Sequence, residues 1–507
     1  MAVLALQSAL LVAPTQASDL AAPSAVAAVE PPLYTNKRPG AVHMMRASSG
    51  DYYAYDFADV NGAIKIKVWQ STDSVRWSAP TIINANTKAN GRGWGLMKFW
   101  APEVIESGGK FYMFYAAVFT GTTSHRLGLA IADSPLGPFN DIGAPLFRGT
   151  TIADWDVIDP NPFIDPFTNF KYLYFARDGG TVAAHPDGSG RTTRQSRIFG
   201  VRLDTNWRTP LTSFQLLLKP SQSWEYANHQ SPDGTWRLWN EAPTMIKENN
   251  RFHLLYSANF WDSNDYAFGY ATSDTPLGTF AKYGQNPLAE AIGAYHKAGH
   301  TSAVRSPDGS DWHVSYSVMF DDDGDGVDTI GRFVSRLGWR ADDSLFVNGP
   351  HAGWQVMPSG SANWTDVGQT ATLSASSTTT GQPVGRIVDD ETGIYARLSK
   401  WEWRAANQRA GAWVRMNWAT PQTATHLLVY DSAEPSRRVA TGHFIVNGVD
   451  RYDVTLPQAA PLGSAPGLVE FPTPQSITSL QFVVDSMVQT GAAPAALTEI
   501  EVLSPTT

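Results

Sequence analysis

The chain has 507 residues, of which 43% are hydrophobic and 12% aromatic, and its formal net charge at pH 7 is -9. The negative charge argues against nucleic acid as a partner, because nucleic-acid binding needs a basic surface. The absence of cysteine excludes disulfides, thiolate catalysis and cysteine-ligated zinc, and the length predicts about two or three domains.

Residues 1–32 are predicted to be a leader outside the folded domains. The first 17 residues, MAVLALQSALLVAPTQA, are small and apolar, and an Ala/Pro-rich tract continues to Pro32. This composition resembles the apolar core of a secretory signal peptide without its positive n-region, and a disordered Ala-rich tail is the alternative. We expect a secreted protein with no membrane span, because no later stretch reaches the roughly 18 consecutive apolar residues that a span needs.

Residues 33–357 are predicted to form a five-bladed β-propeller. Aromatic alternation typical of strands recurs at 52–57, 110–117, 171–176, 251–258 and 312–318. A second repeated element precedes each of these segments: RPGAV at 38–42, WAPEV at 100–104, IDPNPF at 158–163, EAPTMI at 241–246 and GHTSAV at 299–304. A single flat unit cannot bury its faces, whereas five sheets packed radially can, with their inner strands around one central pocket.

Residues 358–507 are predicted to form an antiparallel β-sandwich, so that the whole chain is all-β. A Ser/Thr/Gly/Ala-rich stretch at 359–376 indicates a linker. Strand-like segments follow, in the order GAWVRMNW, THLLVYD, GHFIVNG, SLQFVVD and LTEIEVL. Their pattern resembles galactose-binding-like or discoidin-like domains, and this resemblance implies either carbohydrate binding or a structural cap on the propeller.

Two carboxylates stand in neighbouring inner motifs of the predicted propeller. Glu241 opens EAPTMIK directly before an inner strand, and Asp159 has the matching place in VIDPNPFID. One such residue could simply satisfy turn amides. Two at equivalent positions favour function, because buried carboxylates are costly and sugar hydrolysis uses an acid and usually a second carboxylate.

The chain resembles glycoside hydrolase family 43 over roughly residues 34–350. The motifs FWAPEV, IDPNPF, NEAPTMIK and GHTSAV carry the resemblance in this order, with SPLGPF and TPLGTF between them. The resemblance implies an inverting five-bladed propeller that acts on arabinan, arabinoxylan, xylo-oligosaccharides or galactan. It further implies that Glu241 is the general acid, that Asp159 orients this acid and raises its pKa, and that His300 lies on the axis near a metal or ordered water.

The general base is the point at which the chain departs from this pattern. The resemblance implies an Asp-Pro near the start of blade one, where the chain has Arg38-Pro39, and arginine cannot act as a base. Asp56 and Asp59, just after YYAY, are the first candidates for this role, and His43 or Glu103 are the alternatives. Weak or altered hydrolysis is the third possibility.

Further residues are candidates for substrate or metal binding. Trp100 and Trp261 could stack on sugar rings or pack between blades, and the polar candidates for substrate contact are Glu103, His300 and Arg332. The spacing of Asp321, Asp323 and Asp325 matches the first half of a calcium loop, but Arg332 stands at the twelfth position instead of glutamate. The alternatives are therefore a Ca²⁺ site and a solvated acidic hairpin, and no organic cofactor is expected.

Together these features predict a secreted glycoside hydrolase that cleaves α-L-arabinofuranosyl linkages in an oligo- or polysaccharide. One alternative is an exo-galactanase or β-xylosidase of the same architecture. The other is a carbohydrate-binding propeller whose catalysis is impaired because Arg38 replaces the base.

Overall fold

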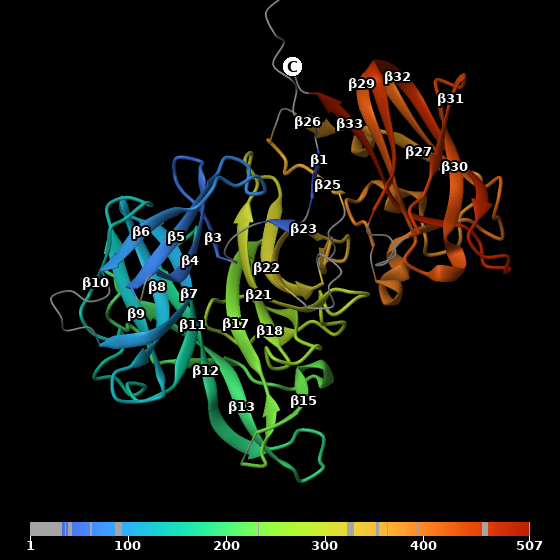
Figure 1. Cartoon of the computed structure of the whole chain (residues 1–507). Coiled ribbons are helices and arrows are strands. Elements are labelled where there is room, and N and C mark those ends of the chain that lie inside the picture. Colours follow the sequence, from blue (N-terminus) through green and yellow to red (C-terminus); the bar gives the residue numbers. More distant parts are fainter. Residues whose placement is uncertain are drawn as a thin grey trace, which may run out of the picture. The chain divides into compact units, whose positions relative to one another are not determined.

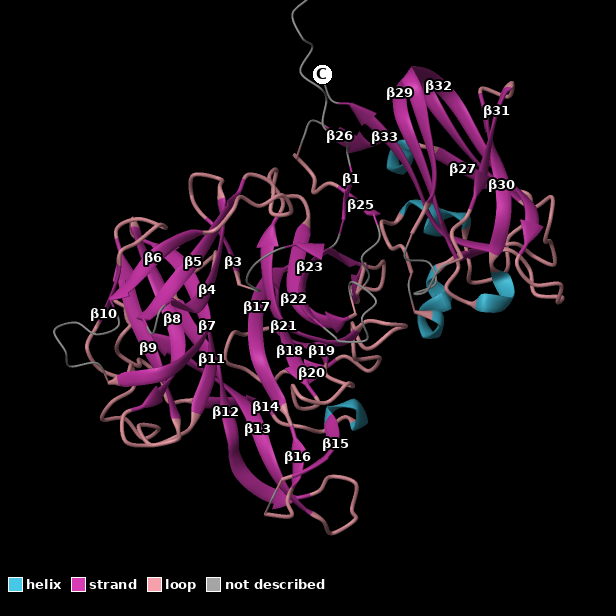
Figure 2. Cartoon of the chain, in the orientation of Figure 1, coloured by secondary structure: helices cyan, strands magenta, loops and turns pink. Residues whose placement is uncertain are grey.

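The computed structural model describes residues 33–35, 37–38, 43–60, 63–86, 94–231, 233–321, 329–350, 354–361, 364–393, 395–458 and 465–505. Within these ranges the fold is all-β, as predicted, and the only helices are short 3₁₀ turns (Figure 2). These turns are η2 (Ser223–Glu225), η3 (Gly368–Thr370), η4 (Val384–Val388), η5 (Ala396–Trp401) and η6 (Pro435–Arg437). No helix of the described part is long and apolar enough to cross a membrane.

Five antiparallel blades follow one another along the chain, which confirms the predicted propeller (Figure 1). Blade one contains β3 (Met44–Arg46), β4 (Tyr52–Val60), β5 (Ala63–Ser71) and β6 (Thr81–Asn86). Blade two contains β7 (Gly95–Ser107), β8 (Lys110–Phe119), β9 (His125–Ala132) and β10 (Phe139–Asp141). The outer strands β6 and β10 pair in parallel and join these two blades into one sheet.

The other three blades complete the ring. Blade three contains β11 (Val157–Ile164), β12 (Lys171–Ala184), β13 (Thr192–Leu203) and β14 (Gln215–Leu218), and it is extended by β15 (Tyr226–Gln230) and β16 (Trp236–Leu238). Blade four contains β17 (Asn240–Glu248), β18 (Arg251–Ala258), β19 (Ala267–Ser273) and β20 (Ala281–Lys282). Blade five contains β21 (His296–Arg305), β22 (Trp312–Phe320), β23 (Thr329–Trp339) and β24 (Leu345–Val347).

The segment around Arg38 closes the ring and does not belong to blade one. Strand β2 (Lys37–Arg38) pairs with β23 of blade five, with Arg38 opposite Arg332. The expectation that Arg38-Pro39 occupies the inner motif of blade one is therefore wrong. The reason is that an N-terminal strand is used to complete the last blade, so the repeat of blade one begins later in the chain.

The hydrophobic core of the propeller lies between the blades. The second strand of each blade turns alternate side chains to its two neighbours, since successive residues of a strand point to opposite faces. Met113 and Tyr115 thus pack against blade one, whereas Tyr112 and Phe114 pack against blade three. Because both faces are covered, the second strands are rich in apolar and aromatic residues throughout, as the sequence pattern had indicated.

The C-terminal residues form a separate eight-stranded antiparallel sheet. Its strands are β26 (Trp364–Asp366), β27 (Thr372–Ala375), β28 (Trp403–Arg404), β29 (Trp413–Asp431), β30 (Val439–Val446), β31 (Asp450–Thr455), β32 (Gly467–Met487) and β33 (Ala496–Pro505). The N-terminal half of β29 pairs with β27 and its C-terminal half with β33, with a shift of register between the halves. The two halves thereby form two layers around one apolar core, as a sandwich requires. Strands β1 (Leu33–Thr35) and β25 (Trp354–Val356) form a small sheet of their own.

Candidate active site

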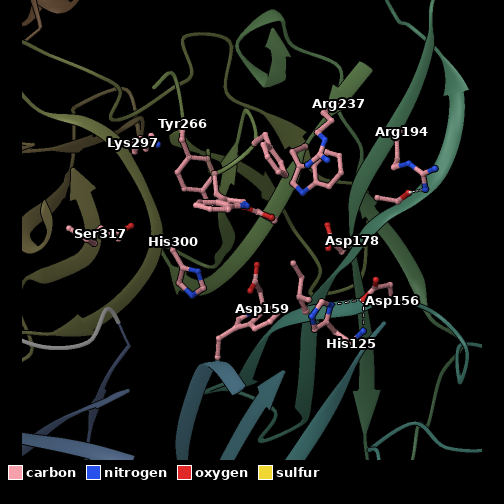
Figure 3. Close-up of a pocket in the computed structure, with 18 of the residues that line it drawn as sticks. His125, Asp156, Asp159, Asp178, Arg194, Arg237, Tyr266, Lys297, His300 and Ser317 are labelled. Atoms are coloured by element: carbon pink, nitrogen blue, oxygen red, sulfur yellow. Dashed lines mark hydrogen bonds and ion pairs between the residues drawn. The ribbon is translucent and has the colours of Figure 1, made fainter. Parts of the chain in front are cut away.

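A cavity of about 700 Å³ lies among the inner strands and loops of blades two to five. Many of the residues that line it are polar or aromatic, and Figure 3 shows several of them pointing into it. A second hollow of about 250 Å³ adjoins the cavity, because Trp100, His300, Ser317 and Ile330 line both. Asp56 and Arg332 line only this second hollow.

The inner strands of blades two to five all contain the same β-bulge. Each has a shift of register, between Trp100 and Glu103, Ile158 and Asn161, Glu241 and Thr244, and Gly299 and Ser302. Each also has one non-glycine residue with positive φ inside the bulge, namely Ala101, Asp159, Ala242 and His300. Such backbone costs on the order of 1–3 kcal/mol per residue and is concentrated at functional sites in proteins.

The position of the bulge shows that the two central carboxylates do not occupy the equivalent positions that the sequence had predicted. Asp159 is the positive-φ residue of its strand, with φ 53°, whereas Glu241 directly precedes Ala242, with φ 48°. Glu241 therefore corresponds to Ile158, and the two carboxylates are offset by one residue instead of equivalent. Both also lie inside inner strands, and both line the cavity.

Glu241 is almost completely buried, with 5% of its surface exposed. Burial raises its pKa well above the ordinary value of 4.5, and the nearby charges of Asp159 and Asp178 raise it further. Tyr266 Oη donates a hydrogen bond of 2.9 Å to Glu241 Oε1, which opposes this rise and holds the carboxyl group in place. Glu241 is therefore suited to stay protonated and to donate a proton.

Asp159 is buried beside it but is better stabilised as an anion. The backbone N–H of Ala242 donates a hydrogen bond of 3.0 Å to Asp159 Oδ2. Burial raises the pKa of Asp159, while His300 and the Ala242 N–H lower it. Glu241 has two negative neighbours, Asp159 and Asp178, whereas Asp159 lies beside His300 and the Ala242 N–H, so Asp159 ionises before Glu241.

Tyr266 reaches Glu241 because the facing residue of blade five is glycine. A Cβ at Gly299 would lie 2.2 Å from Cε1 of the Tyr266 ring, which is far inside van der Waals contact. Gly299 thus provides the space for Tyr266.

A second group of polar side chains lies on the blade-two and blade-three side of the cavity. His125 Nδ1 lies 2.9 Å from Asp156 Oδ1, and the His125 backbone N–H donates to the same oxygen. Burial and the charges of Asp156 and Asp159 raise the pKa of Asp178 to about 6. One atom each of His125, Asp156 and Asp178 lie within 4.8 Å of one another, a spacing that could hold a metal ion.

Asp56 and Arg332 lie together in the adjoining hollow. Asp56 is on β4 and accepts a hydrogen bond of 2.8 Å from the Phe57 N–H. Burial raises the pKa of Asp56, while Arg332 lowers it. Of the two first candidates for the base, the structure places Asp56 beside the cavity, whereas the side chain of Asp59 lies outside the described part.

The predicted substrate-binding residues have different locations. Trp100, Trp261 and His300 line the cavity, and Trp261 is 60% exposed there. Glu103 lines neither hollow; its carboxylate lies 2.8 Å from His43 Nδ1 and accepts a hydrogen bond from Asn161, so it connects blades.

The structure describes only one residue of the predicted calcium motif. Asp323 and Asp325 lie outside the described residues. Asp321 directly follows β22 and lines neither hollow.

Sequence reasoning missed several residues of the cavity wall. They are His125, Asp156, Asp178, Arg194, Arg237, Tyr266 and Lys297. The sequence contained a usable signal for Asp178, because YFARDGG places this carboxylate shortly after the aromatic run of β12 and directly before two glycines.

Comparison with known proteins supports the assignment of the fold. Residues 35–345 match the glycosyl hydrolases family 43, and residues 366–503 match a domain of unknown function, DUF7402. A beta-D-galactofuranosidase of Aspergillus niger is 26% identical over 297 residues, which cover 55% of this chain and 73% of the relative. An alpha-L-arabinofuranosidase of Humicola insolens is 26% identical over 316 residues, covering 59% of each chain.

A solved structure gives the same result for the propeller. The crystal structure of a thermostable family-43 glycoside hydrolase is 31% identical, with a TM-score of 0.52, and the match covers 64% of this chain and 99% of that one. A chain with these blades, this buried acid and a family match over more than half its length belongs to glycosyl hydrolase family 43 and is a glycoside hydrolase.

Proposed function

We propose that the protein is an inverting hydrolase that removes α-L-arabinofuranosyl residues from polysaccharides. One observation carries the proposal: Glu241 is a buried carboxyl whose pKa is raised by burial and by Asp159, and it lines a cavity that adjoins the hollow of Asp56. An acid and a base that flank one sugar are what inversion requires.

In the proposed reaction Glu241 gives its proton to the glycosidic oxygen as the bond from this oxygen to the anomeric carbon breaks. Asp56 takes a proton from a water molecule whose oxygen forms the new bond on the opposite face of the sugar. The carboxylate form of Asp56 is favoured by Arg332, which opposes the effect of burial on the Asp56 pKa. Asp159 remains charged, orients the strand that carries the acid and keeps the Glu241 pKa high.

The choice of sugar is supported by the names of the relatives. One is an alpha-L-arabinofuranosidase and another a beta-D-galactofuranosidase, so a five-membered furanosyl ring is common to both. The galactofuranosidase makes β-D-galactofuranosyl the alternative glycone for the same site.

Turnover of a panel of 4-nitrophenyl glycosides tests this proposal. We expect the wild type to hydrolyse the α-L-arabinofuranoside and to release the sugar with inverted configuration, as followed by NMR in the first minutes. Glu241→Gln should lower kcat by about 100-fold or more, whereas Glu106→Gln, which changes a partly exposed glutamate of β7, should have no effect. Absence of turnover on every furanoside and pyranoside of the panel would refute the proposal.

We further propose that the protein is secreted, on the basis of its signal-like first 17 residues. Expression of the full chain in a secreting host should release protein that lacks this segment into the medium. Retention of the intact segment on cytoplasmic protein would contradict secretion.

A further inference from the structure

Two arginines stand side by side on the wall of the cavity that blade three contributes. Arg194 on β13 and Arg237 on β16 are direct partners in a parallel strand pair, and both line the cavity. Like charges at facing positions of neighbouring strands repel each other. The repulsion between the two guanidinium groups is therefore reduced by every anion that lies close to them.

Each guanidinium is fixed in place, but only one has a direct acidic partner. Arg194 Nη2 lies 2.8 Å from Oδ2 of Asp233, an exposed residue in the turn of the hairpin formed by β15 and β16. Arg237 Nε donates to Ser231 Oγ at 3.0 Å, and its guanidinium carbon lies 4.0 Å from the centre of the Phe260 ring. Among the described residues, no carboxylate forms a direct ion pair with Arg237, although the charges of Asp178, Asp233 and Asp262 act on it from further away.

The arginines lie on the side of the cavity away from the proposed base. Figure 3 shows Arg194 and Arg237 on the opposite side of the pocket from His300 and Ser317, which also line the hollow of Asp56. Aromatic rings connect Glu241 to Arg237, since Trp239 donates a hydrogen bond to Glu241 and packs edge-on against the Phe260 ring at 5.3 Å. Because the cleaved sugar lies between acid and base in an inverting site, the arginine side must hold the leaving group.

We propose that this side of the pocket binds a uronic acid residue of the polysaccharide, whose carboxylate is held by Arg237 and Arg194. The inference rests on the proposed function, since it assigns the leaving-group side of the same site. A carboxylate is planar and matches the fork of guanidinium N–H groups, so it can bridge two adjacent arginines and relieve their repulsion. The exposed Trp261 ring offers a surface for the sugar ring that carries the carboxylate.

A matched pair of substrates tests the uronate subsite. An arabinofuranosyl-bearing acidic polysaccharide is compared with the same material after chemical reduction of its carboxyl groups, which leaves the linkages unchanged. We expect kcat/KM to be about 10- to 100-fold higher on the acidic form, and we expect added salt to reduce this ratio. Equal rates on the two forms would overturn the inference.

Variants that remove one positive charge test whether Arg237 and Arg194 cause the preference for the acidic substrate. Arg237→Gln and Arg194→Gln should each reduce the acidic-to-reduced rate ratio by about 10-fold, and the use of a ratio cancels any general loss of activity. Arg191→Gln is the matched control, because Arg191 lies near the same hairpin but pairs with Asp187 and does not line the cavity. A ratio that persists in both pocket variants would contradict the assignment.

A binding measurement separates this inference from the proposed function. Calorimetry with a uronic acid trisaccharide on Glu241→Gln protein needs no turnover, and we expect Arg237→Gln in that background to weaken binding by about 10-fold. Loss of all hydrolysis with this binding intact would refute the arabinofuranosidase proposal alone. Turnover of arabinofuranosides with no uronate binding would refute the subsite alone.

Discussion

Replacement of Asp159 by asparagine should move the pH dependence of catalysis in a direction fixed by the geometry. The new amide would keep an oxygen for the Ala242 N–H, which donates to Asp159 at 3.0 Å, but the change would remove a negative charge that raises the Glu241 pKa. At the roughly 6 Å that bounds direct charge interactions, and with an effective dielectric constant of about 20, two unit charges repel by about 2.8 kcal/mol. This corresponds to about two pH units.

The direction in which the pH profile shifts follows from the role of Glu241 as an acid. Activity is lost on the alkaline side as Glu241 gives up its proton, so a lower Glu241 pKa moves the alkaline limb of kcat/KM to lower pH. We expect the limb of Asp159→Asn to lie about two pH units below that of the wild type, measured with 4-nitrophenyl α-L-arabinofuranoside between about pH 4 and pH 9. Asp133→Asn, which changes an exposed aspartate, is the control.

An alkaline limb that stays in place, or that moves to higher pH, would refute this reasoning. Either result would mean that the charge of Asp159 does not control the protonation of Glu241, even though both side chains line one cavity. A fall in kcat alone would not be sufficient support, because a merely structural role of Asp159 would also produce it.

Four further outcomes follow from the contacts described. Tyr266→Phe should move the same alkaline limb to higher pH by about one unit, because the hydrogen bond that favours ionised Glu241 is lost. Trp261→Ala should raise KM for polysaccharide by about 2- to 10-fold and leave kcat unchanged, since its exposed ring lies on the cavity wall and offers a face to bound sugar. Asn161→Ala should lower the free energy of unfolding by about 1–3 kcal/mol in denaturant titration, because two hydrogen bonds between blades disappear. His313 is fully buried, and burial lowers its pKa to about 3. The free energy of unfolding should therefore fall by about 1.4 kcal/mol per pH unit as the pH falls from about 6.5 toward 3, because only the unfolded state binds the proton there. His313→Leu should remove this pH dependence in thermal melts at several pH values.

The repeat pattern was sufficient to predict the propeller, because each blade contains the same order of an inner motif followed by an aromatic strand. Alternating aromatic strands such as 110–117 are long enough to be recognised, and both of their faces must be buried between neighbouring blades. The inner motifs at 100–104, 158–163, 241–246 and 299–304 all lie on inner strands, as expected.

The details of the site were less predictable, for two physical reasons. A β-bulge shifts the register by a residue, so matched motifs did not reveal that Glu241 and Asp159 are offset. Residues such as Tyr266 and Arg237 enter the pocket from other strands and loops, and their approach depends on space and pairing that no local pattern records. Arg38 was misplaced because a strand from the N-terminal end completes a blade formed from the other end of the propeller.

The shared bulge has a consequence for how new activities could arise on this scaffold. Each inner strand of blades two to five carries one extra residue at this bulge, so the positive-φ residue and the residue before it are two neighbouring positions near the axis. In blades three to five only one position of each pair is ionisable, and the other holds Ile158, Ala242 or Gly299. The ionisable side chain is the positive-φ residue in blades three and five and the residue before it in blade four, so the same bulge can present a functional group to the cavity from either of two neighbouring positions.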